Sequence, residues 1–262
     1  MPIYFDQMNR AVDLPSTPKR IISIVPSQTE LLFDLGLDEE IIGITKFCIH
    51  PQSLVKSKLK IGGTKVLNIN LIKELKPDLI IGNKEENERG QVEELMQHFP
   101  VWMSDIADLP CAIDMVKRVG ELTGKNVKAS KLIRNINSRF DQLNITSQGL
   151  KVAYLIWRKP YIVAGKGTFI DDMLQKCGLI NVFNIQRYPE VTSDQLMNLN
   201  PDVILLSSEP YPFKEKHLAE FKSLLPNATV KLVDGELFSW YGSRLLHAPA
   251  YFKSLLGDLK SV

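Results

Sequence analysis

Apolar and polar positions along this chain follow two periods, one typical of buried strands and the other of helices. The segment Arg20 to Val25 is rich in β-branched residues and almost continuously apolar, as a strand buried on both faces should be. Pro26 follows it, and Ser27-Gln28-Thr29-Glu30 has the spacing of a capping box that opens a helix over 31–35. The same order recurs, with strands expected at 41–44, 79–81 and 101–103 and helices at 68–76, 91–98 and 111–122. The second half of the chain repeats it, with strands expected at 152–156, 203–206 and 230–233 and helices at 168–178, 192–199, 214–225 and 244–256. This alternation predicts a parallel sheet with helices on its faces.

A longer helical pattern occupies the middle of the chain, from Lys125 to Gln148. Its apolar positions recur at steps of three and four and so share one helical face: Ile133, Ile136, Phe140 and Leu143. Gly124 precedes the segment and Gly149 follows it as a C-terminal stop. About 23 helical residues would extend roughly 35 Å. The pattern therefore predicts one long backbone helix that joins two α/β lobes.

The two halves of the chain also echo each other in sequence. Residues 71–81 and 195–205 share a short helix, then Pro77-Asp78 or Pro201-Asp202, then a buried strand. Residues 30–37 resemble 172–179 in the same order, and Thr168-Phe169-Ile170-Asp171 reads as a second capping box. A Pro-Asp pair before a strand is also common loop chemistry, but two matches in one order favour a duplicated lobe. We expect an N-terminal lobe over 1–122, a connecting helix over 123–149 and a C-terminal lobe over 150–262.

Composition excludes several classes of protein. Of 262 residues, 32 are Lys or Arg and 30 are Asp or Glu, so there is no overall charge that would favour nucleic acid. No apolar run approaches the length of a membrane span. The start of the chain shows neither a signal peptide nor a Cys that could carry a lipid, so a cytoplasmic location stays open beside an exported one.

The sequence contains no recognisable catalytic or metal-binding motif. Gly165-Lys166-Gly167-Thr168 has the wrong glycine spacing for a phosphate-binding loop. The four histidines form no ligand-spaced pair, and Cys48-x-His50 alone is a weak metal pattern. The other two cysteines, Cys111 and Cys177, lie far from Cys48, which is typical of buried thiols rather than a disulfide framework. We predict no catalytic residue and no resident metal site.

Aromatic residues stand out at loop positions. Phe47 and Trp157 follow predicted strands, and Tyr188 and Trp240 are expected in loops on the same side. In open α/β sheets, ligands bind beyond the carboxyl ends of the strands. A cleft walled by such rings suits a large, partly apolar ligand. The alternative is that these rings pin their loops to the core.

Several of these segments resemble one known family in the same order along nearly the whole chain. They are Arg20 to Glu30, Gly43 to Cys48, Lys76 to Ile80, Ile156-Trp157, Gly165 to Ile170, Tyr188 to Val191, Pro201 to Leu205 and Ser208 to Phe213. The series resembles the helical-backbone class of ABC-transporter substrate-binding proteins, and within it the cobalamin-binding subgroup.

That resemblance implies two Rossmann-like lobes joined by a single helix, with cobalamin or a related corrinoid held in the interlobe cleft. It also implies a non-enzymatic monomer of the periplasm or cell envelope that delivers its ligand to a permease. Carried over by position, the cleft would be lined by Ser27, Phe47, Trp157, Thr168, Phe169, Tyr188 and Trp240.

In the same family, one acidic residue on each lobe docks on permease arginines. The C-terminal lobe has Asp194 at that position, whereas the N-terminal lobe has Asn70, with Glu74 one turn later. The N-terminal contact therefore departs from the family pattern.

Two alternatives remain at the level of sequence. Within the class, the rival ligands are a ferric siderophore and haem. From another class, the rival is a cytosolic metallocofactor-handling protein or an enzyme on chelatase-like lobes.

Overall fold

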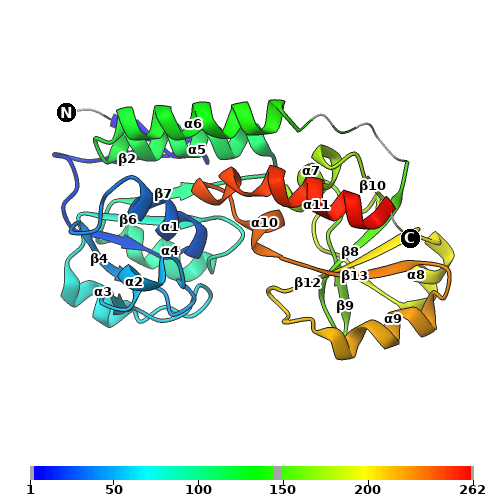
Figure 1. The fold of residues 1–262 in the computed structure, drawn as a ribbon. Coiled ribbons are helices and arrows are strands. Elements are labelled where there is room, and N and C mark those ends of the chain that lie inside the picture. The colour runs from blue at the N-terminus through cyan, green and yellow to red at the C-terminus, as the bar shows by residue number, and fades with distance from the viewer. Residues whose placement is uncertain (1–2, 144, 146–148, 261–262) are drawn as a thin grey trace. The chain divides into compact units, whose positions relative to one another are not determined.

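The computed structural model describes residues 3–143, 145 and 149–260, and its chain divides into two compact α/β units. Unit 1 comprises Met1–Ile106, Pro110–Ile136 and Tyr241–Arg244, and unit 2 comprises Ala107–Leu109, Asn137–Trp240 and Leu245–Val262. Figure 1 follows the chain by colour through both units. The units differ from a simple split of the sequence, because the segment 241–244 returns to unit 1.

The core of unit 1 is a five-stranded sheet in which every neighbouring pair is parallel. The strand order is β5 (Leu59–Lys60), β4 (Ile41–Ile44), β3 (Ile21–Ser23), β6 (Leu79–Asn83) and β7 (Val101–Ser104). Every residue of β3, β6 and β7 is buried, which explains their nearly continuous apolar sequences. The predicted parallel sheet is confirmed for this unit.

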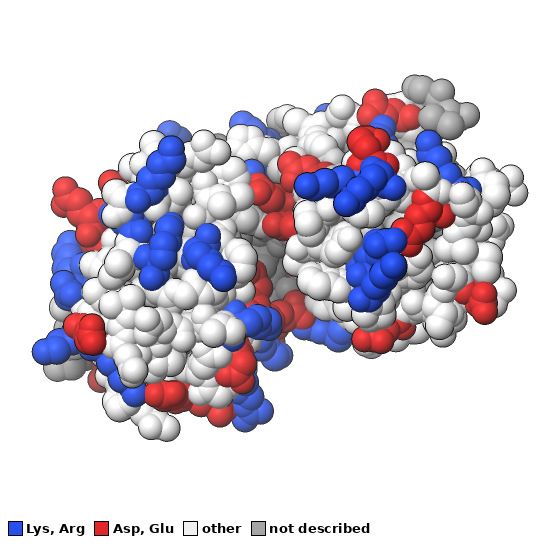
Figure 2. All heavy atoms as spheres, turned by 90° about the horizontal axis from the view of Figure 1, so that it is seen from below, with Lys and Arg blue, Asp and Glu red and all other residues white. Residues whose placement is uncertain are grey.

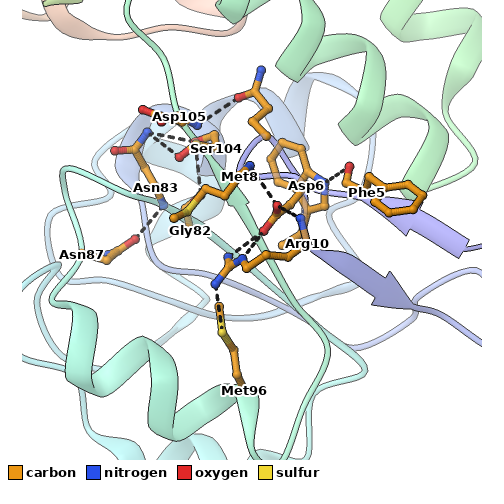
Figure 3. Close-up of polar contacts among 12 residues, drawn as sticks. Phe5, Asp6, Met8, Arg10, Gly82, Asn83, Asn87, Met96, Ser104 and Asp105 are labelled. Carbon is orange, nitrogen blue, oxygen red and sulfur yellow. Dashed lines mark hydrogen bonds and ion pairs between the residues drawn. The ribbon is translucent and has the colours of Figure 1, made fainter.

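Helices connect these strands, and a short hairpin precedes them. The helices are α1 (Pro26–Asp34), α2 (Gln52–Val55), α3 (Ile69–Leu75), α4 (Arg89–Met96), α5 (Leu109–Leu122) and α6 (Asn126–Asp141). The hairpin pairs β1 (Ile3–Phe5) with β2 (Ala11–Asp13) in antiparallel register. Its turn is held by Asp6, a fully buried carboxylate that accepts a 2.6 Å bond from the Arg10 guanidinium (Figure 3).

The capping box predicted at Ser27 is wrong. Helix α1 begins at Pro26, directly after Val25, and no side chain caps its N-terminus. Proline is well suited to the first helical position, because its fixed φ suits a helix and its missing N–H is not needed there. Ser27 therefore lies inside the first turn instead of before it.

The predicted long helix is shorter than expected at its end. Helix α6 stops at Asp141; Gln142, Leu143 and Ile145 are not helical, and residues 144 and 146–148 lie outside the described part of the chain. Its start is set by Gly124, which has φ +66° and ends α5. The Lys125 N–H bonds the Gly120 carbonyl at 2.7 Å, the pattern of a Schellman motif.

Unit 2 has a mixed sheet of six strands, not the purely parallel one that the sequence indicated. The path runs β11 (Glu190–Val191), β9 (Tyr161–Val163), β8 (Lys151–Trp157), β12 (Val203–Ser207) and β13 (Thr229–Val233), while β10 (Ile180–Asn181) pairs with the start of β8. Strands β9 and β8 are antiparallel. Only residues 158–160 separate them, which is too short for the crossover that parallel strands require.

The helices of unit 2 follow the predicted order, except that the helix at Glu236–Ser239 was not predicted and two others begin differently. They are α7 (Phe169–Lys176), α8 (Ser193–Leu199), α9 (Leu218–Leu224), α10 (Glu236–Ser239) and α11 (Ala248–Lys260). Short 3₁₀ helices at Glu215–His217 and Ser243–Leu246 take the starts of the helices expected at 214–225 and 244–256. The second is interrupted at His247, two residues before Pro249, which cannot donate a helical hydrogen bond.

The internal repeat seen in the sequence is present in the backbone. Helix α3 is capped at its C-terminus by Lys76 with φ +46° and ψ +63°, and helix α8 by Asn200 with φ +42° and ψ +63°. Each is followed by Pro-Asp and a fully buried strand. The two aspartates also match, since Asp78 accepts from the Arg20 N–H and Asp202 from the Lys151 N–H.

Candidate functional site

The carboxyl ends of β6 and β7 in unit 1 carry a buried network of amides and a hydroxyl (Figure 3). Ser104 Oγ accepts from Gln28 Nε2 at 2.5 Å and from Asn83 Nδ2 at 2.9 Å. The Asn83 N–H donates to Asn87 Oδ1 at 2.8 Å, and Asn87 Nδ2 donates to the Ile24 carbonyl at 3.0 Å. Most of the hydrogen-bonding groups of these side chains are paired with one another. The network therefore forms a rigid polar layer beneath the strand ends.

The two predicted ligand residues of unit 1 differ in exposure. Phe47 is 51% exposed in the loop after β4, with Lys46 Nζ 5.2 Å from the centre of its ring. Ser27 is 2% exposed in the first turn of α1, and its hydroxyl has no hydrogen-bond partner among the described residues. Phe47 therefore offers a large apolar surface to a ligand, and Ser27 offers a single buried hydroxyl.

The segment 241–244 of unit 1 forms polar contacts with α1 and with the loop after β6. The Tyr241 hydroxyl donates a 2.7 Å bond to Glu86 Oε1, and burial raises the pKa of the Glu86 carboxyl. Arg244 holds Glu30 in a bidentate ion pair, with bonds of 2.9 and 2.5 Å and both side chains 14% exposed. These pairs anchor the returning segment onto α1 and the loop after β6.

Unit 2 presents an indole at the carboxyl end of its longest strand. Trp157 is the last residue of β8 and is 39% exposed. Its ring centre lies 5.6 Å from that of Tyr211 at an interplanar angle of 68°, an edge-to-face contact. Strand β8 runs parallel to β12, so Trp157 lies at the edge where open α/β sheets bind ligands.

Thr168 and Phe169 are buried at the start of α7. Thr168 caps this helix, accepting from the Asp171 N–H at 3.1 Å and donating to the Gly165 carbonyl at 2.8 Å. The Asp171 carboxylate accepts instead from Lys166, Gln175 and Asn181. Phe169 is 3% exposed. Both residues thus have a structural role within unit 2, and their contact with a ligand stays a prediction.

The remaining predicted ligand residues of unit 2 are Tyr188 and Trp240. Tyr188 is partly buried in a loop held against the end of β9, where the Val163 N–H bonds the Pro189 carbonyl at 3.2 Å. Trp240 follows α10 and is 7% exposed. Their role at the ligand is likewise a prediction.

The predicted docking residues are exposed on the two repeated helices. Asp194 lies in the first turn of α8, whose cap is formed by Thr192 and Gln195 in a reciprocal capping box. Within the described residues, the Asp194 carboxylate therefore takes no part in the cap. Asn70 holds the matching place in α3, and Glu74 is exposed one turn later.

No group of three or more His, Cys, Asp or Glu residues suited to a metal ion lies within the described ranges. In the same part of the chain, no helix combines the length and apolar character of a membrane span. On the face drawn in Figure 2, basic and acidic side chains are interspersed among uncharged ones on both units.

The sequence did not single out two residues that shape the indole's surroundings, Tyr211 and His217. Tyr211 packs against Trp157, and His217 lies against Tyr211. Tyr211 falls in a segment, Ser208 to Phe213, that carried part of the resemblance, and this was the available signal.

Comparisons with known proteins show the family of the chain. The family described as "Periplasmic binding protein" matches residues 21–226. The vitamin B12-binding protein of Pectobacterium carotovorum is 24% identical over 250 residues, which cover 92% of this chain and 90% of that protein.

Solved structures show the same fold. The periplasmic vitamin B12 binding protein of Vibrio cholerae has a TM-score of 0.80 at 22% identity, covering 95% of this chain and all of that one. The periplasmic heme-binding protein of Roseiflexus has a TM-score of 0.78 at 19% identity, covering 92% and 98%.

Proposed function

Because this chain belongs to the family of periplasmic binding proteins, we propose that it is the substrate-binding component of an ABC importer that carries cobalamin or a related corrinoid. The observation that carries the ligand class is the exposed indole of Trp157, seated on Tyr211 at the carboxyl edge of its sheet. Leaving such a ring in water is unfavourable by tens of calories per Å², so an exposed, supported indole is suited to a large ring ligand.

Phe47 supports the same proposal from unit 1. It is also a ring left half-exposed after a strand, at the matching edge of the other sheet. Ser27, Thr168, Phe169, Tyr188 and Trp240 are proposed to contribute at most single polar groups or edges, because each is buried or partly buried. Relatives described as vitamin B12-binding proteins favour a corrinoid among large ring ligands.

Haem is the second candidate, and one contact favours it. Lys46 lies beside the Phe47 ring, where its ammonium could pair with a carboxylate at the edge of a ring ligand. Haem carries two such carboxylates. A ferric siderophore with an anionic rim would use the same lysine.

Delivery to a permease is proposed through helices α3 and α8. Asp194 would pair with an arginine of the permease, while Asn70 offers a neutral acceptor that lacks the charge-assisted contribution. The interface would then be weaker at α3, unless Glu74 substitutes from one turn away. The protein is proposed to act outside the cytoplasmic membrane, as a monomer and without catalytic activity.

The testing experiment is a thermal-shift panel with cobalamin, cobinamide, haem and a ferric siderophore. A ligand present at 100 times its dissociation constant should stabilise the protein by about 2.7 kcal/mol. Stabilisation by cobalamin and cobinamide but not haem supports the corrinoid proposal, and the reverse pattern supports haem.

Stabilisation by none of the four would reject transport of these chelates. Where one of the compounds does stabilise the protein, a turnover assay with that compound separates the enzyme alternative from a binding protein.

A further inference from the structure

The indole of Trp157 is supported on one side by a chain of aromatic contacts. Tyr211 meets the indole edge-to-face, and the Tyr211 N–H bonds the Ile156 carbonyl at 3.2 Å, directly before Trp157. The loop that carries Tyr211 is thus tied to the strand that carries the indole. A ring held in place before the ligand arrives loses less conformational freedom on binding.

Tyr211 is itself held by two further rings. Its centre lies 4.7 Å from that of Phe213 and 5.6 Å from that of His217. Phe213 and His217 also meet edge-to-face, with centres 5.6 Å apart and planes at 87°. The three rings form a compact cluster in which moving His217 would require Tyr211 to move.

Hydrogen bonds define the protonation state in which this cluster is stable. The Lys214 N–H donates to His217 Nδ1 at 2.8 Å, so Nδ1 must keep its lone pair and the neutral ring carries its proton on Nε2. His217 Nε2 lies 3.4 Å from the Tyr211 hydroxyl, which it can reach as a donor. A protonated imidazole would place an N–H at Nδ1, directly against the Lys214 N–H.

Burial and the neighbouring cations also favour the neutral form of His217. Burial lowers the pKa of the imidazole, and the nearby cations Lys216 and Arg158 lower that pKa further. Glu220 and a smaller effect of the Lys214 backbone raise the pKa, but the net direction is downward. The Glu220 carboxylate is already bonded to Arg158 at 2.7 Å and to the Tyr161 hydroxyl at 2.6 Å. The neutral imidazole is therefore the form that the surroundings favour near neutral pH.

We propose that Tyr211 and His217 are positioning residues for Trp157, which hold the exposed indole in its ligand-binding orientation only while His217 is neutral. This inference rests on the proposed function, because it concerns how the indole meets the chelate. It predicts a binding site that weakens as His217 takes up a proton.

The first test is independent of any ligand. Near-ultraviolet circular dichroism is recorded for the protein and for Trp157→Phe, and their difference reports the indole's surroundings. We expect this difference signal to fall as the pH is lowered from about 8 to about 5, the range in which histidine titrates. In His217→Asn, whose amide oxygen can accept the Lys214 N–H but does not titrate, the signal should not change with pH.

The second test measures the affinity for cobalamin over the same pH range. We expect about a tenfold loss for the native protein, which corresponds to about 1.4 kcal/mol, and a flat profile for His217→Asn. Tyr211→Leu should weaken binding at every pH, while Tyr211→Phe should keep most of the affinity because the ring edge remains. Tyr4→Phe is the matched control, since Tyr4 lies in β1 of the other unit.

Matching pH profiles for the native protein and His217→Asn, in both measurements, would overturn the inference. If instead Trp157→Ala binds cobalamin normally, the proposed ligand site fails. The dichroism series still decides whether Tyr211 and His217 position the indole.

Discussion

The hydroxyl of Tyr241 donates a 2.7 Å hydrogen bond to Glu86 Oε1, joining residues 155 positions apart in the chain. Tyr241 is 5% exposed, so this contact is shielded from water. Burial raises the pKa of Glu86 above the ordinary 4.5, although the Tyr241 hydroxyl and Lys65 both lower it. Ionisation of the Glu86 carboxyl therefore lowers the stability of the folded protein.

The first prediction follows from the sign of that shift. Between pH 4.5 and the raised pKa, the folded protein binds more protons than the unfolded chain, so this group's contribution to stability falls as the pH rises. Glu86→Gln keeps an oxygen that can accept from Tyr241 and removes the charge. We expect Glu86→Gln to be more stable than the native protein at pH 7, with the difference shrinking as the pH approaches 4.5.

Urea unfolding at a series of pH values measures this difference. Tyr241→Phe serves as the comparison, because it leaves the carboxylate without its donor and should destabilise the protein most at high pH. A stability difference for Glu86→Gln that does not depend on pH would contradict the assignment.

The second prediction compares two tryptophans. Trp157→Ala should weaken binding of the transported chelate substantially, because it removes both area and an aromatic face from the proposed site. Trp102→Ala should leave the affinity almost unchanged and cost about 3–5 kcal/mol of stability, because Trp102 is 0% exposed within β7. Calorimetric titration and urea unfolding of both variants provide the measurements. An unchanged affinity in Trp157→Ala would show that the ligand binds elsewhere.

The third prediction concerns the two repeated aspartates, Asp78 and Asp202. Asp78 accepts from the backbone N–H groups of Lys19 and Arg20 at 2.7 and 2.8 Å, whereas Asp202 accepts from the Lys151 N–H at 2.7 Å. Hydrogen bonds to a charged group contribute about 1.5–3 kcal/mol each at most, and less where water reaches them. We expect Asp78→Ala to lose more stability than Asp202→Ala, as measured by urea unfolding. Equal losses would mean that the second bond of Asp78 contributes nothing.

The fourth prediction separates docking from helix capping at Asp194. Thr192 and Gln195 already form the cap of α8, so Asp194→Asn should lower the melting temperature only slightly. Thr192→Ala is the matched control and should cost about 1 kcal/mol of stability. Asp194→Asn should instead weaken complex formation with the cognate permease, where its charge would be paired.

Helix α3 provides the complementary test of the same interface. Asn70→Asp should strengthen the complex, and Glu74→Gln should weaken it only if Glu74 substitutes for the missing acid. Binding of each variant to permease in nanodiscs gives the measurement. An Asp194→Asn variant that melts earlier but docks normally would leave α8 without a docking role.

Local patterns in the sequence were sufficient for the parts of this protein that depend on near neighbours. The cap at Thr168, the repeated Pro-Asp turns and the buried strands of unit 1 each follow from residues a few positions apart. Strand burial is set by side-chain type over a few residues, so it can be read before the fold is known. Cap spacing is less decisive, because the box expected at Ser27 fails where Pro26 begins α1.

Contacts between distant residues were decided only by the tertiary structure. Nothing local shows that Tyr241 reaches Glu86, or that Thr168 and Phe169 are buried while Trp157 is exposed. A loop aromatic has the same sequence signature whether it faces a ligand or the core. Its exposure depends on which remote side chains pack against it, and for Trp157 those are Tyr211 and, behind it, His217.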